Sequence, residues 1–197
     1  NLIERAKNIM MTPKTEWDVI NGEEANVPAI ITGYVLPLAG AAAAAAFIGY
    51  GFVGVSYFGI TVRGIDWGLY QAISVLAGAL IAVFVSALVI DALAPSFGSE
   101  KNFGKSVQLV AYTWTPAWVG GLLSILPAIA IIGSLAGLYG FYLLYVGLPV
   151  LKKTPEDKKV MYYVVSLLTI FVVFIIIGAI MSRLLMPAFG LSYGQAD

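Results

Sequence analysis

The feature that most constrains this chain is a set of four long stretches without a charged residue. They cover residues 25–62, 67–90, 106–151 and 160–182 of a chain of 197 residues. Charged residues make up 11% of the chain and its mean hydropathy is +0.90, whereas a soluble domain carries about 25% charged residues. A helix needs about 20 apolar residues to cross the hydrocarbon core of a bilayer. The sequence therefore predicts an all-α, polytopic membrane protein.

The lengths of the four stretches predict how often the chain crosses. The second and fourth stretches each suit one helix. The third would form a helix of about 69 Å at 1.5 Å per residue, so we expect two crossings with a break near Pro127 and Gly133. The first stretch is cramped for two crossings. We expect one helix there, followed by a segment rich in Gly and aromatic residues that lies at the membrane interface.

This interpretation gives a bundle of five transmembrane helices, preceded by short amphipathic N-terminal helices. We expect an arm over residues 1–28 and a membrane domain over residues 29–197. The predicted spans are approximately 30–51, 69–92, 106–126, 129–151 and 160–184.

The basic residues predict the orientation. With five spans, nine of the 11 Lys and Arg residues fall on the side of the N-terminus, and only Arg63 and Arg183 fall on the other. A sixth span in the first stretch would change this split to eight against three or make it nearly even. Because Lys and Arg collect in cytoplasmic loops, we expect a cytoplasmic N-terminus and a C-terminus on the outer side.

The arm holds two short pieces with apolar residues at helical spacing, separated by Thr12 and Pro13. It lacks the central apolar stretch of a signal peptide. Trp17 suits headgroup depth at the membrane interface. The arm can lie flat on the inner leaflet, pack on the bundle or bind a partner, and the sequence leaves these alternatives open.

A charged turn, "KKTPEDKK", separates the last two predicted spans. Its lysines can simply fix the topology and anchor the protein at headgroups. They can also form a docking site for an anionic lipid or a protein. The candidate partner or lipid contacts are therefore Trp17, Lys152, Lys153, Lys158 and Lys159.

Several kinds of chemistry are missing from the composition. The chain has no Cys and no His, which excludes disulfides, thiol nucleophiles, imidazole bases and most transition-metal sites. Asp91 ends the second predicted span, where a solvated or helix-end role is favoured over a buried ion ligand. A Ser/Lys dyad would need a lysine within the membrane, and we expect none there. We therefore predict no catalytic residue, no cofactor and no metal site, and a protein that is not an enzyme. A net charge of zero gives no indication of a nucleic-acid partner.

The third predicted span is the most polar, with Tyr112, Thr113 and Thr115 near a proline, Pro116. The proline frees the carbonyl four residues back, which threonine hydroxyls or water can satisfy. These four residues predict either a kinked helix packed in the bundle or a notch that lines a small polar cavity.

Small residues follow one face of the fourth predicted span. Gly133, Gly137, Gly140 and Gly147 would let neighbouring backbones approach closely. We expect them to serve packing within the bundle rather than dimerisation.

The order of these elements resembles the Yip family, small five-span proteins named for interaction with Ypt/Rab GTPases. The resemblance rests on "TPKTEWDVI" before the first span, "YVLPLAG" within it, "FGSEKNFGKSVQLVAYTWTPAWVGG" and "GLYGFYLLYVGLPVLKKTPEDK". It covers nearly the whole chain and is closest to the prokaryotic branch, because the arm is short. The resemblance implies five spans with an inner N-terminus, a place in a bacterial inner membrane, a membrane-organising role and no catalytic residues.

Three functions follow as hypotheses. The first is a non-enzymatic integral membrane scaffold or adaptor that organises membrane proteins or lipids. The second is a small transporter or channel, and the third is a protein that binds a lipid chain between loosely packed helices. The expected partners are membrane lipids and another membrane or membrane-associated protein, with a homo-oligomer as an open alternative.

Overall fold

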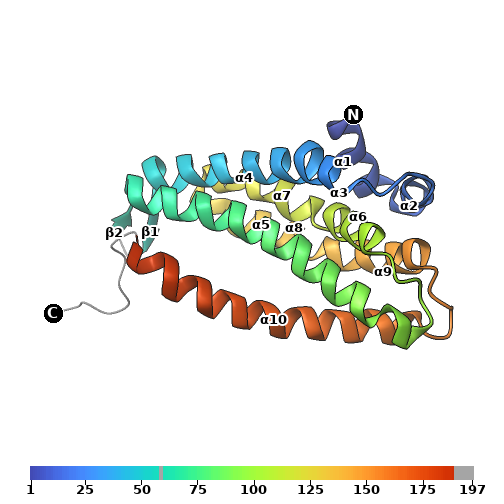
Figure 1. Ribbon diagram of the computed structural model, residues 1–197. Helices are drawn as coiled ribbons and strands as arrows, with labels where there is room; N and C mark the ends of the chain where they lie inside the picture. The colour runs from blue at the N-terminus through green and yellow to red at the C-terminus, as the bar shows by residue number, and fades with distance from the viewer. Residues whose placement is uncertain (58–59, 189–197) are drawn as a thin grey trace.

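The computed structural model describes residues 1–57 and 60–188, which form an all-α bundle (Figure 1). The predicted fold class is confirmed. A small antiparallel pair of strands, in which Val55 lies opposite Val62, interrupts the helices. The elements are α1 (Leu2–Met11), α2 (Pro13–Gly22), α3 (Val27–Ile30), η1 (Ile31–Val35), α4 (Leu36–Ile48), η2 (Gly49–Val53), β1 (Val55–Tyr57), β2 (Ile60–Val62), α5 (Ile65–Leu93), η3 (Ala94–Phe97), α6 (Phe103–Thr113), α7 (Thr115–Gly121), η4 (Leu122–Ile125), η5 (Pro127–Ile129), α8 (Ala130–Ala136), α9 (Tyr139–Lys152) and α10 (Lys159–Ala188).

Four helices in the described part of the chain are long and apolar enough to cross a membrane. They are Val27–Val53, Ile65–Phe97, Pro127–Lys152 and Lys159–Leu184. Each overlaps one predicted span and extends it by a few residues. The first uncharged stretch forms one such helix, as expected, because α3, η1, α4 and η2 follow one another directly. The predicted interfacial segment after it folds into β1 and β2, and residues 58–59 lie outside the described residues.

The predicted span 106–126 differs from the other four. It consists of α6, α7 and η4 rather than one helix, and it is interrupted at Trp114 (φ −79°, ψ −5°). Pro116 explains the interruption, since proline lacks an N–H and suits only the first turn of α7. None of these pieces reaches the length of a span by itself, so the count of five spans stays a prediction.

The two ends of the bundle differ in how many charged residues they carry. One end carries α1, α2, the start of α6 and the turn between α9 and α10 (Figure 1). We call it the lysine-rich end, because these segments hold nine of the 11 basic residues. The opposite end carries β1, β2 and the far end of α10. The side of the membrane that each end faces, and the predicted outer C-terminus at residues 189–197, which lie outside the described residues, stay predictions.

Glycines set how closely the inner segments approach. A Cβ on Gly120 of α7 would collide with the carbonyl of Gly133 on α8, and one on Gly140 would lie 2.8 Å from the carbonyl oxygen of Thr113. The small face predicted for the fourth span therefore packs within the bundle at these positions, against α6 and α7.

Candidate functional site

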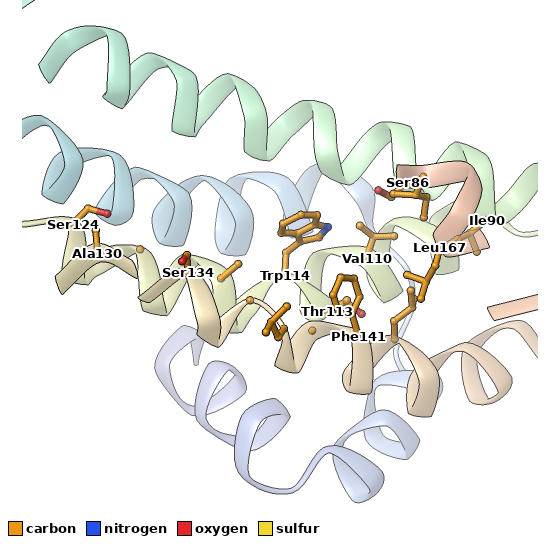
Figure 2. Close-up of a pocket in the computed structure, with 17 residues that line it drawn as sticks. Ser86, Ile90, Val110, Thr113, Trp114, Ser124, Ala130, Ser134, Phe141 and Leu167 are labelled. Atoms are coloured by element: carbon orange, nitrogen blue, oxygen red, sulfur yellow. The ribbon is translucent and has the colours of Figure 1, made fainter. Parts of the chain in front are cut away.

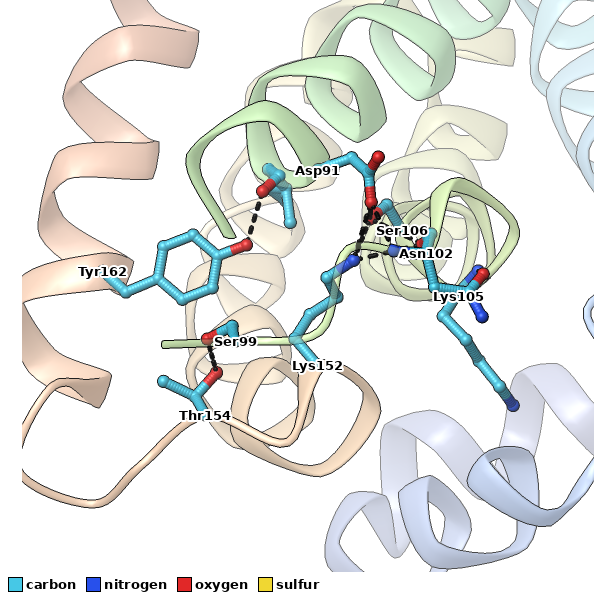
Figure 3. A network of polar contacts seen from close by, with 9 residues as sticks. Asp91, Ser99, Asn102, Lys105, Ser106, Lys152, Thr154 and Tyr162 are labelled. Carbon is cyan, nitrogen blue, oxygen red and sulfur yellow. Dashed lines mark hydrogen bonds and ion pairs between the residues drawn. The ribbon is translucent and has the colours of Figure 1, made fainter. Parts of the chain in front are cut away.

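A buried ion pair organises the lysine-rich end (Figure 3). The Lys152 ammonium lies 2.9 Å from Asp91 Oδ1, and neither residue is more than 6% exposed. Lys152 Nζ also donates to Ser106 Oγ at 2.8 Å and to the Asn102 carbonyl at 3.1 Å. Three acceptors match the three N–H groups of an ammonium. These three contacts offset the high desolvation energy of the buried Lys152 ammonium.

The carboxylate of Asp91 is satisfied as well. Its Oδ1 accepts the Asn102 N–H at 2.8 Å and the Ser106 hydroxyl at 3.2 Å. Asn102 is also the N-cap of α6, because its side chain accepts the Lys105 N–H at 3.0 Å. The network therefore joins the end of α5, the start of α6 and the end of α9.

The end of α9 determines which way its two lysines point. Lys153 adopts a left-handed conformation (φ 48°) that ends α9, so Lys152 stays in the helix and points into the bundle. Lys153 points outward and pairs with Glu100 at 2.8 Å. The Glu100 N–H also donates to the Lys152 carbonyl at 2.8 Å, which fixes the loop before α6 to the end of α9.

Further hydrogen bonds tie α10 and its turn to this end. The Tyr162 hydroxyl donates to the Ile90 carbonyl at 2.5 Å, and Ser99 Oγ donates to Thr154 Oγ1 at 2.9 Å. Tyr162 is fully buried and its ring stacks on that of Phe97. These contacts connect neighbouring segments, and none of them presents a polar group to solvent.

The expectation that Asp91 is solvated is wrong. It lies near the end of α5, as expected, but it is 6% exposed and paired with Lys152. A lysine also lies beside a serine inside the bundle, which is the arrangement of a Ser/Lys dyad. Both Ser106 and Lys152 have 0% exposure, and Asp91 keeps the ammonium paired. The arrangement therefore provides no accessible nucleophile, and its contacts are structural.

The N-terminal arm packs on the bundle at the same end. The Trp17 side chain is fully buried and lies over Gly147 of α9, where a Cβ would approach the indole ring within 2.5 Å. Trp17 also meets the ring of Tyr112 edge to face, with centroids 6.3 Å apart. The prediction that Trp17 contacts lipid or a partner is therefore wrong, because the protein itself covers this side chain, and its depth in the membrane stays a prediction.

Charged contacts hold the arm in this position. Arg5 donates to Glu16 at 2.5 Å, pairs with Glu23 and lies over the ring of Tyr112 at 5.5 Å. Burial alone would lower the pKa of Arg5, but Glu23 and Glu16 outweigh that effect and raise it above its ordinary value. Arg5 is therefore a permanent cation in the centre of the arm.

Lys105 joins the arm to α6. Its Nζ donates to the carbonyls of Ile20, Asn21 and Glu23 at 3.2, 2.9 and 2.7 Å. These carbonyls belong to the end of α2, where a cation is favourable. Burial lowers the pKa of Lys105, while the nearby Glu23 opposes that shift. The arm is thus a folded part of the lysine-rich end.

The remaining lysines of the predicted contact set lie at the surface. Lys153 and Lys158 are exposed, and Lys159 is partly exposed and pairs with Glu156 at 2.5 Å. Lys152 is the exception, since it is fully buried. The predicted cluster therefore divides into one structural lysine and three that remain available to a partner or a lipid headgroup.

The predicted polar notch does not form. Tyr112 faces the arm, Thr115 bonds to the hydroxyl of Tyr34 at 2.7 Å, and Thr113 turns toward another side of α6. Pro116 is buried at the start of α7. Neither threonine hydroxyl bonds to the carbonyl that the proline frees. The four residues therefore contact three different neighbours and share no polar cavity.

Thr113 instead lines a largely apolar cavity of about 430 Å³ (Figure 2). Figure 2 shows it extending from Ser86, Ile90 and Leu167 at one end to Ser124 and Ala130 at the other.

Two hydroxyls in this cavity have no partner. Ser86 Oγ and Thr113 Oγ1 are buried and make no hydrogen bond within the described part of the chain. Ser86 is 3% exposed and Thr113 is 8% exposed. Buried polar groups almost always have partners, so these two hydroxyls leave hydrogen-bonding capacity free inside the cavity.

Sequence reasoning missed Asn102, Ser106, Tyr162 and Ser86. One signal for the ion pair was present, because Lys152 follows Leu148 by four residues and Leu144 by eight and so lies on the same buried helix face. Asn102 is a typical N-cap residue before an apolar stretch. No comparable signal marks Ser86, since one serine in an apolar helix gives no indication of its neighbours.

Known proteins resemble this chain over most of its length. The family model of the Yip1 domain matches residues 7–178. The inner membrane protein YohC of Escherichia coli K12 is 30% identical over 142 residues, which are 70% of this chain and 73% of that protein. The YohC protein of Escherichia coli O6:H1 matches to the same extent. No solved structure matches significantly. With its apolar helical bundle, and with the match extending from the arm into α10, the chain is a membrane protein of the Yip1 domain family.

Proposed function

We propose that this protein is a non-enzymatic scaffold or adaptor of a bacterial inner membrane, with the lysine-rich end on the cytoplasmic side. The nine basic residues at that end support the orientation, and the inner membrane location follows from the resemblance to YohC. The partners are membrane lipids and another membrane or membrane-associated protein.

The observation that carries the proposal is the ordered surface of the lysine-rich end. Trp17, Arg5 and Lys105 hold the arm on the bundle, and the Lys152–Asp91 pair holds the loops beneath it. A surface held in one shape is preorganised for docking, because little entropy is lost when a partner binds. The exposed Lys158, in a turn that also exposes Glu156 and Asp157, gives this surface charged groups for a partner or a lipid headgroup.

A transporter is less well supported by the contacts. The hydroxyls of Tyr34 and Thr115 bond to each other, and Tyr112 faces the arm. A permeation path would need such groups to line a continuous cavity. The cavity that Thr113 does line is mostly apolar.

Site-specific photo-crosslinking in intact cells tests the proposal. A photoreactive amino acid at Lys158, in the exposed turn, should give a discrete crosslinked protein product. The matched control is the same amino acid at Leu168, which is exposed on α10 and should crosslink mainly to lipid.

A second experiment tests the alternative function, a transporter. Reconstituted liposomes are assayed for flux of ions, protons and small solutes. A saturable flux that Tyr34→Phe or Thr115→Val abolishes, together with no protein product at Lys158, would overturn the scaffold proposal in favour of a transporter.

A further inference from the structure

The cavity of about 430 Å³ lies among α5, α6, α7, α8, α9 and α10. Its volume falls in the range of small-molecule sites, about 300–1,000 Å³. No charged residue lines it, and most of the lining is aliphatic, aromatic or glycine. Such a cavity excludes ions and selects an uncharged, mainly hydrocarbon occupant.

The rim of the cavity faces the bilayer. Ser134, Leu138 and Phe141 line the cavity and are also exposed, with Leu138 57% and Phe141 50% accessible. All three belong to the apolar helix Pro127–Lys152, which is long enough to cross the membrane. Molecules at this rim are therefore lipid chains, because the hydrocarbon core surrounds such a helix.

The two unpartnered hydroxyls lie toward the lysine-rich end. Ser86 precedes Asp91 by five residues, about 7.5 Å along α5, and Thr113 lines the same cavity from α6 (Figure 2). A hydroxyl can donate one hydrogen bond. An ester carbonyl is the matching acceptor, and glycerolipids carry it between headgroup and chain. A charged headgroup would find no free counter-charge here, since Asp91 and Lys152 pair with each other.

We propose that this cavity binds one acyl chain of a membrane glycerolipid, whose ester carbonyl accepts hydrogen bonds from Ser86 and Thr113. The chain enters between α8–α9 and α10 and lies along the cavity toward Ser124. The headgroup remains near the exposed lysines of the turn before α10. The cavity that holds the chain is separate from the docking surface of the scaffold proposal, because no lysine lines it, so either proposal can fail without the other.

Native mass spectrometry tests the site with a defined probe. The intact protein is delipidated in mild detergent and titrated with dioleoylphosphatidylcholine, its ether-linked analogue and oleic acid. One ester lipid should bind per chain. It should bind about tenfold more tightly than the ether analogue, which lacks both carbonyls. Tighter binding of oleic acid than of the ester lipid would overturn the assignment to a glycerolipid.

Matched variants connect that binding to the cavity. Ser134→Phe fills the rim and should weaken lipid binding at least about tenfold. Leu135→Phe, at the exposed neighbouring residue that does not line the cavity, should bind as the wild type does. Ser86→Ala with Thr113→Val should keep chain binding but lose the preference for ester over ether. Thr169→Val is the control for those hydroxyls, because Thr169 already bonds to the Val165 carbonyl.

A fluorescence measurement on the wild-type protein complements the variants, since it does not depend on folding of a substituted cavity. Trp114 lines the cavity, so lipid with brominated chains should quench it saturably, and Trp114→Phe should remove that component. Wild-type binding by Ser134→Phe, or binding that does not saturate at one lipid, would overturn the proposal. Dimers that form as lipid is lost would instead identify a second copy of the chain as the occupant.

Discussion

The ion-pair network at the lysine-rich end and the cavity deeper in the bundle differ in how their buried polar groups are hydrogen-bonded. At the lysine-rich end, Lys152, Asp91 and Ser106 are buried and satisfy one another. In the cavity, Ser86 and Thr113 are equally buried but have no partner. The first group stabilises the fold by itself, whereas the second reaches full hydrogen bonding only when another molecule binds. Burial of a polar residue therefore does not by itself indicate a functional site. Whether the buried group already has a hydrogen-bond partner distinguishes the two cases.

The largest expected effect comes from breaking the ion pair. Lys152→Met should lower the free energy of unfolding by about 3–5 kcal/mol, because it leaves the buried Asp91 without its cation. Thermal or denaturant unfolding in mild detergent measures this. The neighbouring Lys153→Met is the control, since the exposed pair with Glu100 contributes at most about 1 kcal/mol. The double variant Asp91→Leu/Lys152→Met should recover much of the loss. Equal effects at Lys152 and Lys153 would contradict the structural role of the pair.

A smaller effect should follow when the arm is displaced. Gly147→Ala introduces a Cβ against the Trp17 ring and should lower stability by about 1–3 kcal/mol. It should also make the arm more sensitive to trypsin and shift tryptophan emission to longer wavelength. Gly40→Ala is the matched control, because no atom lies within 4 Å of its added Cβ. That variant should be neutral or slightly stabilised. An arm equally protected in both variants would show that Trp17 does not hold it.

Thr113 at the end of α6 and Thr115 at the start of α7 allow a partnered and an unpartnered hydroxyl to be compared directly. Thr115→Val removes the partner of the buried Tyr34 hydroxyl, so stability should fall by about 1–3 kcal/mol. Thr113→Val removes a hydroxyl that has no partner, so the delipidated protein should lose less than about 0.5 kcal/mol. The unfolding of both variants is measured without lipid. A larger loss at Thr113 than at Thr115 would contradict the assignment of partners.

The smallest effect on stability is expected at the surface turn. Lys158 is exposed, so Lys158→Gln should change the free energy of unfolding by less than about 0.5 kcal/mol. The same variant should reduce the crosslinked protein product at the neighbouring Asp157, if this turn docks a partner. An unchanged product would remove Lys158 from the proposed contact.

Much of the fold follows from the uncharged stretches, because hydrocarbon length and helix rise fix how such residues can be arranged. The break at Trp114 has its cause in Pro116, but the sequence could not show whether the helix would kink or end there. The packing of the glycine face within the bundle was also predictable. The amphipathic spacing of the arm correctly predicted two helices, but it could not indicate that Trp17 would pack against Gly147.

The buried polar residues were harder to predict. Lys152 appears in the sequence as one of four lysines in a turn, and only its phase on α9 separates it from Lys153. Asp91 meets it from a helix some sixty residues earlier, and such tertiary contacts leave no local pattern. The cavity depends on how several helices pack against one another. The position of Ser86 and Thr113 in its wall is therefore visible only in the folded bundle.

One measurement tests the central claim most directly, that the polar end stabilises the fold and the cavity binds lipid. Thermal unfolding of the delipidated protein is followed as dioleoylphosphatidylcholine is added back. Wild type should show a saturable gain, about 2.7 kcal/mol when free lipid reaches 100 times its dissociation constant. Lys152→Met should start from a lower stability and show the same gain, and Ser134→Phe should start near wild type and gain at most about 1.4 kcal/mol, because its binding is at least about tenfold weaker. An equal gain in Ser134→Phe would contradict the account, because lipid would then act on the outer surface of the bundle rather than in the cavity.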